Sequence, residues 1–190
     1  MAASINAAVS AIQAKFKVTK KIEFRGETTL LVERTEIKEL CAYCKETLGF
    51  SFLIDLSGVD NFGGEPRFEV VYELYQLEKG DSLRLKITVS EDALEVPSVI
   101  DIWPTADWHE REAFDMFGIK FPGHPDLRRI LMWDGYPFYP LRKDFPLAGR
   151  ASDMPDVAFS KAAPLAGGPF VTVPSTATTK DREPRSREIS

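Results

Sequence analysis

Apolar residues recur with the period of an α-helix in two separate stretches of the chain. The first stretch, within residues 1–16, comprises Ile5, Ala8, Val9, Ile12 and Phe16. The second, between Thr35 as the expected N-cap and Gly49 as the expected end, comprises Ile37, Leu40, Cys41, Cys44 and Leu48. Each pattern gives a helix one apolar face, so we expect two amphipathic helices.

Alternating apolar and polar residues indicate β-strands elsewhere. The clearest alternation runs through residues 82–89, and we expect this strand to pair with residues 67–77 across a turn at residues 78–81. Residues 17–32 predict a second hairpin that turns near Gly26. The apolar run at residues 50–56 predicts a well-buried strand, and the glycines and proline of residues 57–67 predict a loop. The sequence therefore predicts an α+β fold, with a mixed or antiparallel sheet and helices packed on it.

The pattern changes after residue 106. Residues 107–118 predict a short acidic helix that begins at Asp107, with Glu110 completing a capping box, and ends at Gly118. Residues 121–147 then hold five prolines and six aromatic residues, so they can form neither a long helix nor a central strand. Long irregular segments are uncommon in compact domains unless they serve a function. An apolar one indicates a surface that packs against a partner.

Composition narrows the possible classes of protein. With 44% hydrophobic and 28% charged residues the chain has an ordinary soluble composition, and its net charge of −5 argues against non-specific nucleic-acid binding. No apolar run is long enough to span a membrane, and the N-terminus resembles neither a signal peptide nor a transit peptide, so we expect the cytoplasm. Large apolar residues become sparse after residue 148. We expect an α+β domain over residues 1–120, an extended docking arm over 121–147 and an irregular tail over 148–190.

Few residues suggest chemistry of their own. Cys41 and Cys44 form a CxxC pair, but they lie within the apolar face of a predicted helix, so we interpret them as buried core thiols. His109 and Glu110 do not begin an HExxH metal motif, because Ala113 stands where the second histidine would be. Arg111 and Asp115 have the spacing of a solvated helical ion pair.

Glu110 shares a helical stripe with the aromatic residues Phe114 and Phe117. A carboxylate at the edge of an apolar face requires a cation or hydrogen-bond donors. The basic residues that could supply the cation are Arg128, Arg129, Arg142 and Lys143. They could do so inside the chain, folding the segment back on its own sheet, or across an interface with a partner. Residue chemistry leaves both interpretations open.

The segments EREAFDMF (Glu110 to Phe117), GHPDLRRIL (Gly123 to Leu131) and PLRKDFPL (Pro140 to Leu147) resemble one known family at fixed spacing. This family is the 30-kilodalton subunit, also called the C subunit, of respiratory complex I, the bacterial NADH:quinone oxidoreductase. One departure is that Phe138 and Tyr139 precede Pro140 where family members often carry Gly-His.

The resemblance implies a peripheral-arm subunit on the cytoplasmic side of the bacterial inner membrane. It implies no cofactor in this chain, with FMN and Fe-S clusters held by other subunits. The expected partners are the 49-kilodalton-type subunit and the cluster-bearing subunits of complex I. The matched positions, to which we assign the arm and its interface rather than catalysis, are Glu110, Arg111, Glu112, Asp115, His124, Asp126, Arg128, Arg129, Arg142, Lys143 and Asp144.

Two alternative functions are compatible with the sequence. One is the equivalent subunit of a membrane-bound hydrogenase or of a ferredoxin- or F420-dependent complex. The other is a free-standing acid–base enzyme that uses His109, Glu110 or His124. For His124, a proton-transfer or metal role competes with a turn histidine that hydrogen-bonds the backbone, and we expect the turn histidine.

Overall fold

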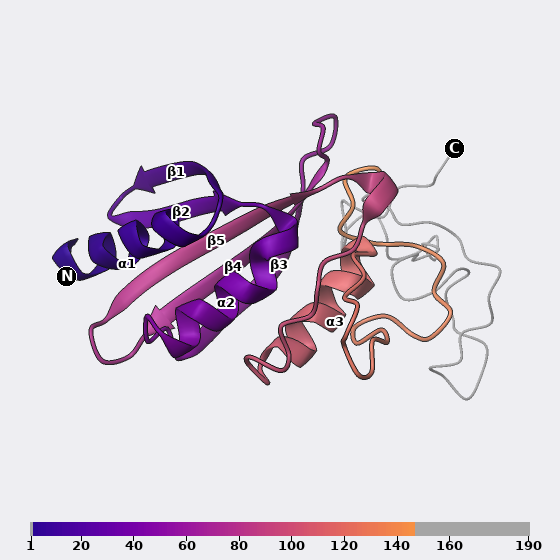
Figure 1. Ribbon diagram of the computed structural model, residues 1–190. Helices are drawn as coiled ribbons and strands as arrows, with labels where there is room; N and C mark the ends of the chain where they lie inside the picture. The colour runs from indigo at the N-terminus through magenta and orange to yellow at the C-terminus, as the bar shows by residue number, and fades with distance from the viewer. Residues whose placement is uncertain (1, 147–190) are drawn as a thin grey trace, which may run out of the picture.

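The computed structural model describes residues 2–146, with side chains from Ile5 onward, as one sheet with three α-helices. The helices are α1 (Ala2–Lys15), α2 (Ile37–Glu46) and α3 (Ala106–Phe117) (Figure 1). The strands are β1 (Val18–Phe24), β2 (Glu27–Val32), β3 (Phe52–Asp60), β4 (Phe68–Gln76) and β5 (Asp81–Val89). Two short 3₁₀ turns are η1 (Arg34–Glu36) and η2 (Glu91–Ala93). Within the described residues no helix reaches the length and apolar character that crossing a bilayer requires.

The sheet has five strands in the order β1-β2-β5-β4-β3. The pairs β1–β2, β5–β4 and β4–β3 are antiparallel, whereas β2 and β5 run parallel with Leu30 opposite Leu85. The predicted mixed sheet of an α+β fold is therefore confirmed, as are the hairpins that join β1 to β2 and β4 to β5.

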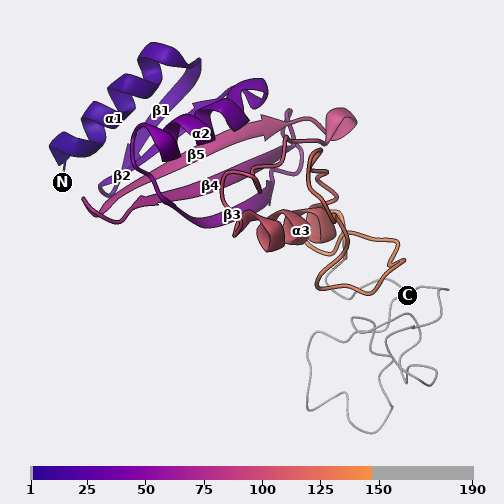
Figure 2. The same ribbon diagram turned by 60° about the horizontal axis from the view of Figure 1, so that its bottom comes forward.

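One face of the sheet carries the core. Leu83, Leu85 and Ile87 of β5 alternate with polar residues and are fully buried. Figures 1 and 2 show α1 and α2 side by side over this same face. Each of these helices has a single apolar stripe. When both helices cover one side of the sheet, the two stripes and the apolar face of the sheet are all removed from water. The opposite face is polar, where Lys86 and Glu69 form a cross-strand ion pair at 3.0 Å.

The third strand differs from the prediction. The expected strand at residues 50–56 was to be well buried, but β3 runs from Phe52 to Asp60 with Phe52 and Ile54 47% and 49% exposed. The pairing of β3 with β4 has a register shift between Leu53 and Asp55, and the exposed Ile54 lies at this irregularity. The predicted loop at residues 57–67 is correspondingly too long, because its first four residues belong to the strand.

The predicted helix starts are also wrong, whereas one predicted end is confirmed. Thr35 lies in η1 and Asp107 lies inside α3, and neither helix has a side-chain hydrogen bond at its N-cap. Gly118 ends α3 in the left-handed conformation (φ +81°), and its N–H donates to the Phe114 carbonyl.

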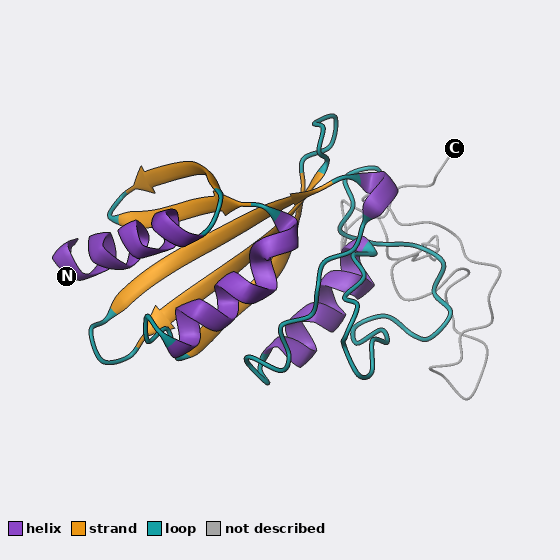
Figure 3. Ribbon diagram, in the orientation of Figure 1, coloured by secondary structure: helices purple, strands orange, loops and turns teal. Residues whose placement is uncertain are grey.

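Residues 121–146, which we call the arm, contain no helix or strand and lie beside α3 on the side away from the sheet (Figures 1 and 3). Phe121, Met132 and Tyr136 are nevertheless buried in the same hydrophobic cluster as the sheet and helices. The division of the chain at residues 120 and 147 stays a prediction, and residues 147–190 lie outside those that the structure describes.

Candidate functional site

The charged residues singled out from the sequence lie on α3 and the arm. Most of those that are buried join two clusters, which we name after their acceptors. The Asp115 cluster joins α3 to the first half of the arm, and the Asp60 cluster joins the end of the sheet to the second half. Together they determine how the arm is placed against the sheet.

The Asp115 cluster is built around a carboxylate with no exposure to solvent. One oxygen of Asp115 accepts the backbone N–H groups of Ile130, Leu131 and Met132 at 3.0, 2.7 and 2.8 Å. The other pairs with the guanidinium of Arg129 at 2.5 Å. A carboxylate that receives three N–H groups and a cation has its charge fully compensated, so burying it is tolerated. Asp115 thus fixes a turn of the arm to the side of α3.

The arginines of this cluster act mainly on backbone carbonyls. Arg129 donates to the carbonyls of Tyr136 and Phe138 at 2.6 and 3.2 Å, and Arg111 donates to those of Arg128 and Arg129 at 3.2 and 3.1 Å. The predicted solvated ion pair between Arg111 and the carboxylate at position 115 is therefore wrong. Five donors on one rigid fork allow a single arginine to satisfy several carbonyls of an irregular segment.

Glu110 is also fully buried but has neutral partners. Its carboxylate accepts a hydrogen bond from the Ser98 hydroxyl at 2.6 Å and another from the Val99 backbone N–H at 2.7 Å. Burial raises the pKa of Glu110, and these two donors partly oppose the rise. The predicted capping box is absent, and of the two kinds of partner that a buried carboxylate requires, a cation or hydrogen-bond donors, the described residues supply donors. Glu110 instead ties α3 to the connector that precedes it.

His124 makes the hydrogen bonds of a turn residue. Its Nδ1 accepts the backbone N–H of Asp126 at 3.1 Å, so in the neutral ring the proton is on Nε2, which faces the Asp107 carbonyl at 3.2 Å. The Asp107 carboxylate lies 3.3 Å from the same nitrogen. This geometry favours the expected turn histidine over a metal ligand, because both ring nitrogens already have partners.

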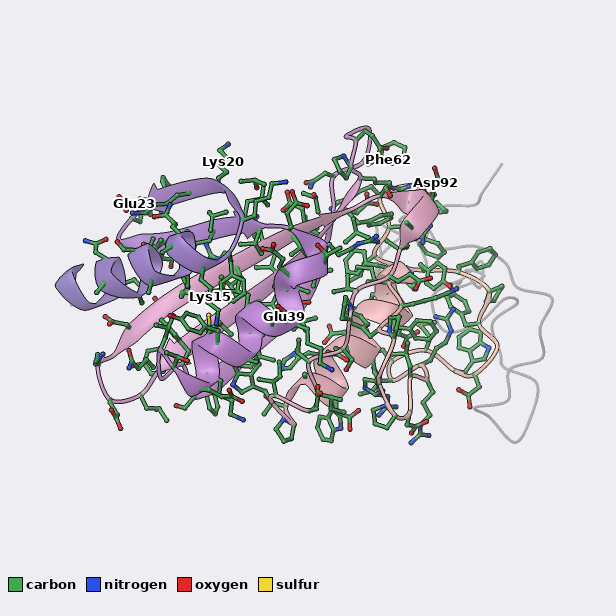
Figure 4. The ribbon with its side chains drawn as sticks, viewed as in Figure 1. Lys15, Lys20, Glu23, Glu39, Phe62 and Asp92 are labelled. Atoms are coloured by element: carbon green, nitrogen blue, oxygen red, sulfur yellow. The ribbon has the colours of Figure 1, made fainter. Side chains whose placement is uncertain are left out.

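The Asp60 cluster lies where β3, β4 and η2 meet, at the end of the sheet marked by Phe62 and Asp92 in Figure 4. The Asp60 carboxylate, with 0% of its side chain exposed, receives two hydrogen bonds from Arg67, each 2.8 Å long. Arg67 also contacts Glu91 at 3.0 Å and stacks 5.1 Å from the Phe62 ring centre. The fork of Arg67 holds the pKa of the Asp60 carboxyl below its usual value.

Three consecutive residues of the arm join this cluster. Asp144 pairs with Arg67 at 2.8 Å, and the Lys143 backbone N–H donates to the Asp60 carboxylate at 2.7 Å. Arg142 donates to the Phe117 carbonyl at 2.7 Å. The second half of the arm is therefore fixed to the domain by charge-assisted hydrogen bonds.

The remaining predicted residues face solvent. Asp126 and Arg128 pair with each other at 2.8 Å, with 64% and 63% of their side chains exposed. Glu112 is exposed, as is Lys143, and within residues 5–146 the side chains of both lack a hydrogen bond or ion pair. Of the two interpretations left open above, the inward-facing charges fit the internal network, whereas these four side chains are exposed to solvent.

Other candidate chemistry is not assembled in the structure. Cys41 and Cys44 are free and buried, as predicted, and burial raises the pKa of Cys44 to about 12. His109 contacts Asp55 at 3.2 Å and is 15 positions from the other histidine. In the part of the chain that the structure describes, no three His, Cys, Asp or Glu side chains are grouped to hold a metal ion.

Sequence reasoning missed Asp60, Arg67, Glu91 and Ser98. Arg67 lies 7 positions from Asp60, 24 from Glu91 and 77 from Asp144, so no local spacing links these residues. One signal was available for Asp60, because it ends an apolar run directly before a turn.

Comparison with known proteins gives a consistent set of matches. The model of the family described as "Respiratory-chain NADH dehydrogenase, 30 Kd subunit" matches residues 30–151. The C subunit of NADH-quinone oxidoreductase from Geotalea uraniireducens (strain Rf4) is 45% identical over 146 residues, which cover 76% of this chain and 89% of that protein. The C 2 subunit of NADH-quinone oxidoreductase from Rhizobium etli (strain CIAT 652) is 51% identical over 126 residues, or 65% of this chain and 67% of that protein.

Solved structures give similar matches. A structure titled as the trypsin-resistant fragment (1-134) of Nqo5 aligns with a TM-score of 0.58 at 33% identity, covering 65% of this chain and 99% of that one. A chain of the membrane-bound sulfane sulfur reductase, described as an archaeal respiratory membrane complex, aligns with a TM-score of 0.64 at 27% identity. That alignment covers 74% of this chain and 84% of the other.

Proposed function

The chain belongs to the family of the 30-kilodalton subunit of respiratory-chain NADH dehydrogenase, and from this membership we propose that it is a cofactor-free assembly subunit of a proton-translocating NADH:quinone oxidoreductase. The observation that carries the proposal is the family match over residues 30–151, which includes most of the sheet, α3 and the whole arm. The chain would set the relative positions of neighbouring subunits, while FMN and Fe-S clusters in those subunits transfer electrons from NADH to quinone.

We propose that the chain lies in the peripheral arm, on the cytoplasmic side of the bacterial inner membrane. Its partners would be the 49-kilodalton-type subunit and the cluster-bearing subunits. The geometry supports a positioning role, because the buried charges of α3 and the arm hold an irregular apolar segment in one conformation. A segment that is rigid before binding loses less conformational entropy when it binds.

The test is purification of the assembly through a tag on this chain, expressed from its own gene in its own host. We expect the tagged chain to bring down the 49-kilodalton-type subunit together with NADH- and flavin-binding subunits, and deletion of its gene to abolish NADH:quinone activity in membranes. Recovery of the chain without any other respiratory subunit would overturn the proposal.

A second candidate is favoured by the structural likeness to the sulfane sulfur reductase chain. The chain would then be the equivalent subunit of a related membrane-bound complex, such as a hydrogenase or a ferredoxin- or F420-dependent enzyme. The same purification separates the two candidates. Co-purified NADH- and flavin-binding subunits support the NADH enzyme, and their absence beside an intact membrane complex supports the related one.

A further inference from the structure

An apolar hollow of about 550 Å³ lies on the surface where α3 meets the arm. Its apolar lining comes from Pro104, Trp108, Ile130 and Leu131. Trp108 is 69% exposed and Leu131 is 62% exposed, so neither side chain contributes much to the chain's own core. We call this hollow the Trp108 groove.

The walls of the groove are fixed by contacts described above. Asp115 binds the backbone N–H groups of Ile130 and Leu131, which holds one wall against α3. Trp108 belongs to α3 itself, so the other wall is helical. A concave site with rigid walls is already formed before a partner arrives, which is the usual condition for a binding surface.

The groove lies next to the edge strand β3. His109, which lines the groove, contacts Asp55 of β3 at 3.2 Å, and Ile54, next to Asp55 in the strand, is 49% exposed. Single exposed apolar residues need no explanation, but neighbouring ones around a hollow mark interaction sites. Trp is also the residue type most enriched at the energetic centre of protein interfaces.

Two carboxylates line the groove, and one of them, Asp107, lies 3.3 Å from His124. Asp107 and Glu112 belong to the lining, and among the described residues Glu112 lacks an ion-pair partner. The neighbouring Arg111 does not neutralise it, because its guanidinium donates to carbonyls of the arm. The groove therefore combines an apolar floor with one acid, Glu112, that has no ion-pair partner among the described residues.

We propose that the Trp108 groove docks a segment of another subunit that carries a large apolar side chain next to a Lys or Arg. The apolar side chain would fill the hollow beside Trp108 and Leu131, and the cation would pair with Glu112. A second copy of this chain is a poor occupant, because the chain has a net charge of −5 and a two-fold contact would place each acidic rim against the other. This inference rests on the proposed function. It adds which surface of the chain binds another subunit and which side chains of that subunit it binds.

The first experiment measures incorporation into the assembly in cells that express tagged and wild-type full-length chains together. We expect Trp108→Ala and Leu131→Ser to lower incorporation at least about tenfold relative to wild type. Phe24→Ala and Leu77→Ser are matched controls, because their wild-type side chains are each 66% exposed and lie at the end of β1 and directly after β4 rather than in the lining of the groove. Equal incorporation of test and control variants would overturn the inference while leaving the proposed function intact.

The second experiment tests the charge. Glu112→Lys should lower incorporation by a larger factor than Glu78→Lys, since Glu78 is an exposed acid in the turn between β4 and β5. The Glu112→Lys defect should shrink in extracts of higher ionic strength, because salt screens exposed charges. Equal defects for the two variants would contradict the proposed Lys or Arg of the partner.

Hydroxyl-radical footprinting distinguishes the occupants. In the purified full-length chain Trp108 should oxidise rapidly, and in the assembly it should be protected. Protection in the chain alone would mean that residues 147–190 or a second copy cover the groove, which would overturn the inference. Failure of the wild-type chain itself to join any assembly would instead overturn the proposed function.

Discussion

Two buried carboxylates on the same helix, Asp115 and Glu110, are accommodated by different chemistry. Asp115 has a cation and three N–H donors, whereas Glu110 has one hydroxyl and one N–H. The pKa of Glu110 is accordingly raised by burial. The native protein then binds the proton of Glu110 more tightly than the unfolded chain does. The contribution of Glu110 to stability is therefore complete below pH 4.5, the ordinary pKa of this carboxyl, and declines as pH rises above it.

Asp60 has the opposite pH dependence. The Arg67 fork lowers the pKa of Asp60 below 3.8, so its contribution is complete above that pH and is lost as pH falls through the lowered value. We predict that Asp60→Asn lowers the free energy of unfolding at pH 7 by about 3 kcal/mol, because buried Arg67 loses its main partner. The difference between variant and wild type should shrink below pH 3.8, as measured by urea denaturation across pH.

The matched control for this prediction is Asp101→Asn. Asp101 pairs with Lys38 at 2.8 Å, but 60% of its side chain is exposed. Surface pairs contribute little, so this change should lower stability by less than about 1 kcal/mol. Equal losses in the two variants would show that burial of the Asp60 cluster has no energetic consequence.

The two thiols of the CxxC pair provide a second prediction at the residue scale. Both side chains are buried, and the pKa of Cys44 is raised to about 12, so almost no thiolate forms at pH 8. We predict that a thiol-reactive chromophore labels Cys41 and Cys44 only as fast as the protein unfolds, and completely in guanidinium chloride. Immediate labelling of the native protein would contradict their place in the core.

At the scale of elements, Gly118 determines how closely the arm approaches the end of α3. A Cβ atom at Gly118 would lie 2.7 Å from the Tyr139 ring and 3.0 Å from the Arg142 guanidinium. At Gly26, in the turn between β1 and β2, φ is almost the same (+82°), but no atom lies within 4 Å of the added Cβ. An alanine would therefore meet a similar left-handed backbone conformation at both positions, but close contacts only at Gly118.

We predict that Gly26→Ala lowers the free energy of unfolding by about 1 kcal/mol through the left-handed conformation alone. Gly118→Ala should lower it by about 1–3 kcal/mol more, because the arm must move to admit the methyl group. In Gly118→Ala, amide hydrogen exchange should be faster within residues 138–146 than in Gly26→Ala. Equal destabilisation by the two variants would mean that the arm does not pack on Gly118 in solution.

The elements that could be predicted from the sequence are those with an unbroken period. Residues 82–89 alternate without interruption and form β5, and the apolar stripe with both cysteines forms α2. The prediction failed at β3, because the loop indicated by Gly63, Gly64 and Pro66 was placed from residue 57 onward, although residues 57–60 belong to the strand. In the structure Gly58 lies within β3 at a position where only glycine fits, because a Cβ atom there would come within 2.6 Å of the Phe117 ring. The close approach of β3 and α3 is a tertiary contact, which the spacing of residues along one segment cannot predict.

The candidate site shows the same limit. The spacing of α3 and the arm indicated which residues matter, but it could not indicate which of them face inward. Arg111 and Asp115 have ideal spacing for a helical pair, yet the arm supplies better partners to each. Once a chain folds back on itself, contacts between distant segments replace the pairs that helical geometry offers.

At the scale of the whole molecule, the arm combines inward-facing and outward-facing charges. Arg142 donates to the Phe117 carbonyl, contacts Glu91 at 3.1 Å and stacks 4.7 Å from the Tyr139 ring centre. Its neighbour Lys143 contributes only its backbone N–H, and its side chain is exposed. Adjacent cations of the same motif therefore act in different ways.

We predict that Arg142→Ala lowers the free energy of unfolding of the isolated chain by about 2 kcal/mol, because a buried carbonyl loses its donor. Lys143→Ala should change it by less than about 0.5 kcal/mol. If Lys143 contacts a partner, its variant should reduce incorporation into the assembly without changing the denaturation curve. A large stability loss for Lys143→Ala would place its side chain inside the domain.

The strand order determines when the domain can fold during synthesis, because β2 pairs with β5. The hairpin of β1 and β2 joins the sheet only through β5, so it emerges from the ribosome long before its neighbour exists. The meander of β3, β4 and β5 is local in sequence and can form first, with β2 added to its edge as β5 appears. Closure of the Asp60 cluster comes later still, because Lys143 follows Asp60 by 83 positions. A nascent chain that stops before the arm therefore holds Asp60 and Arg67 without their last partners, so the domain reaches its final stability only after the arm has been synthesised.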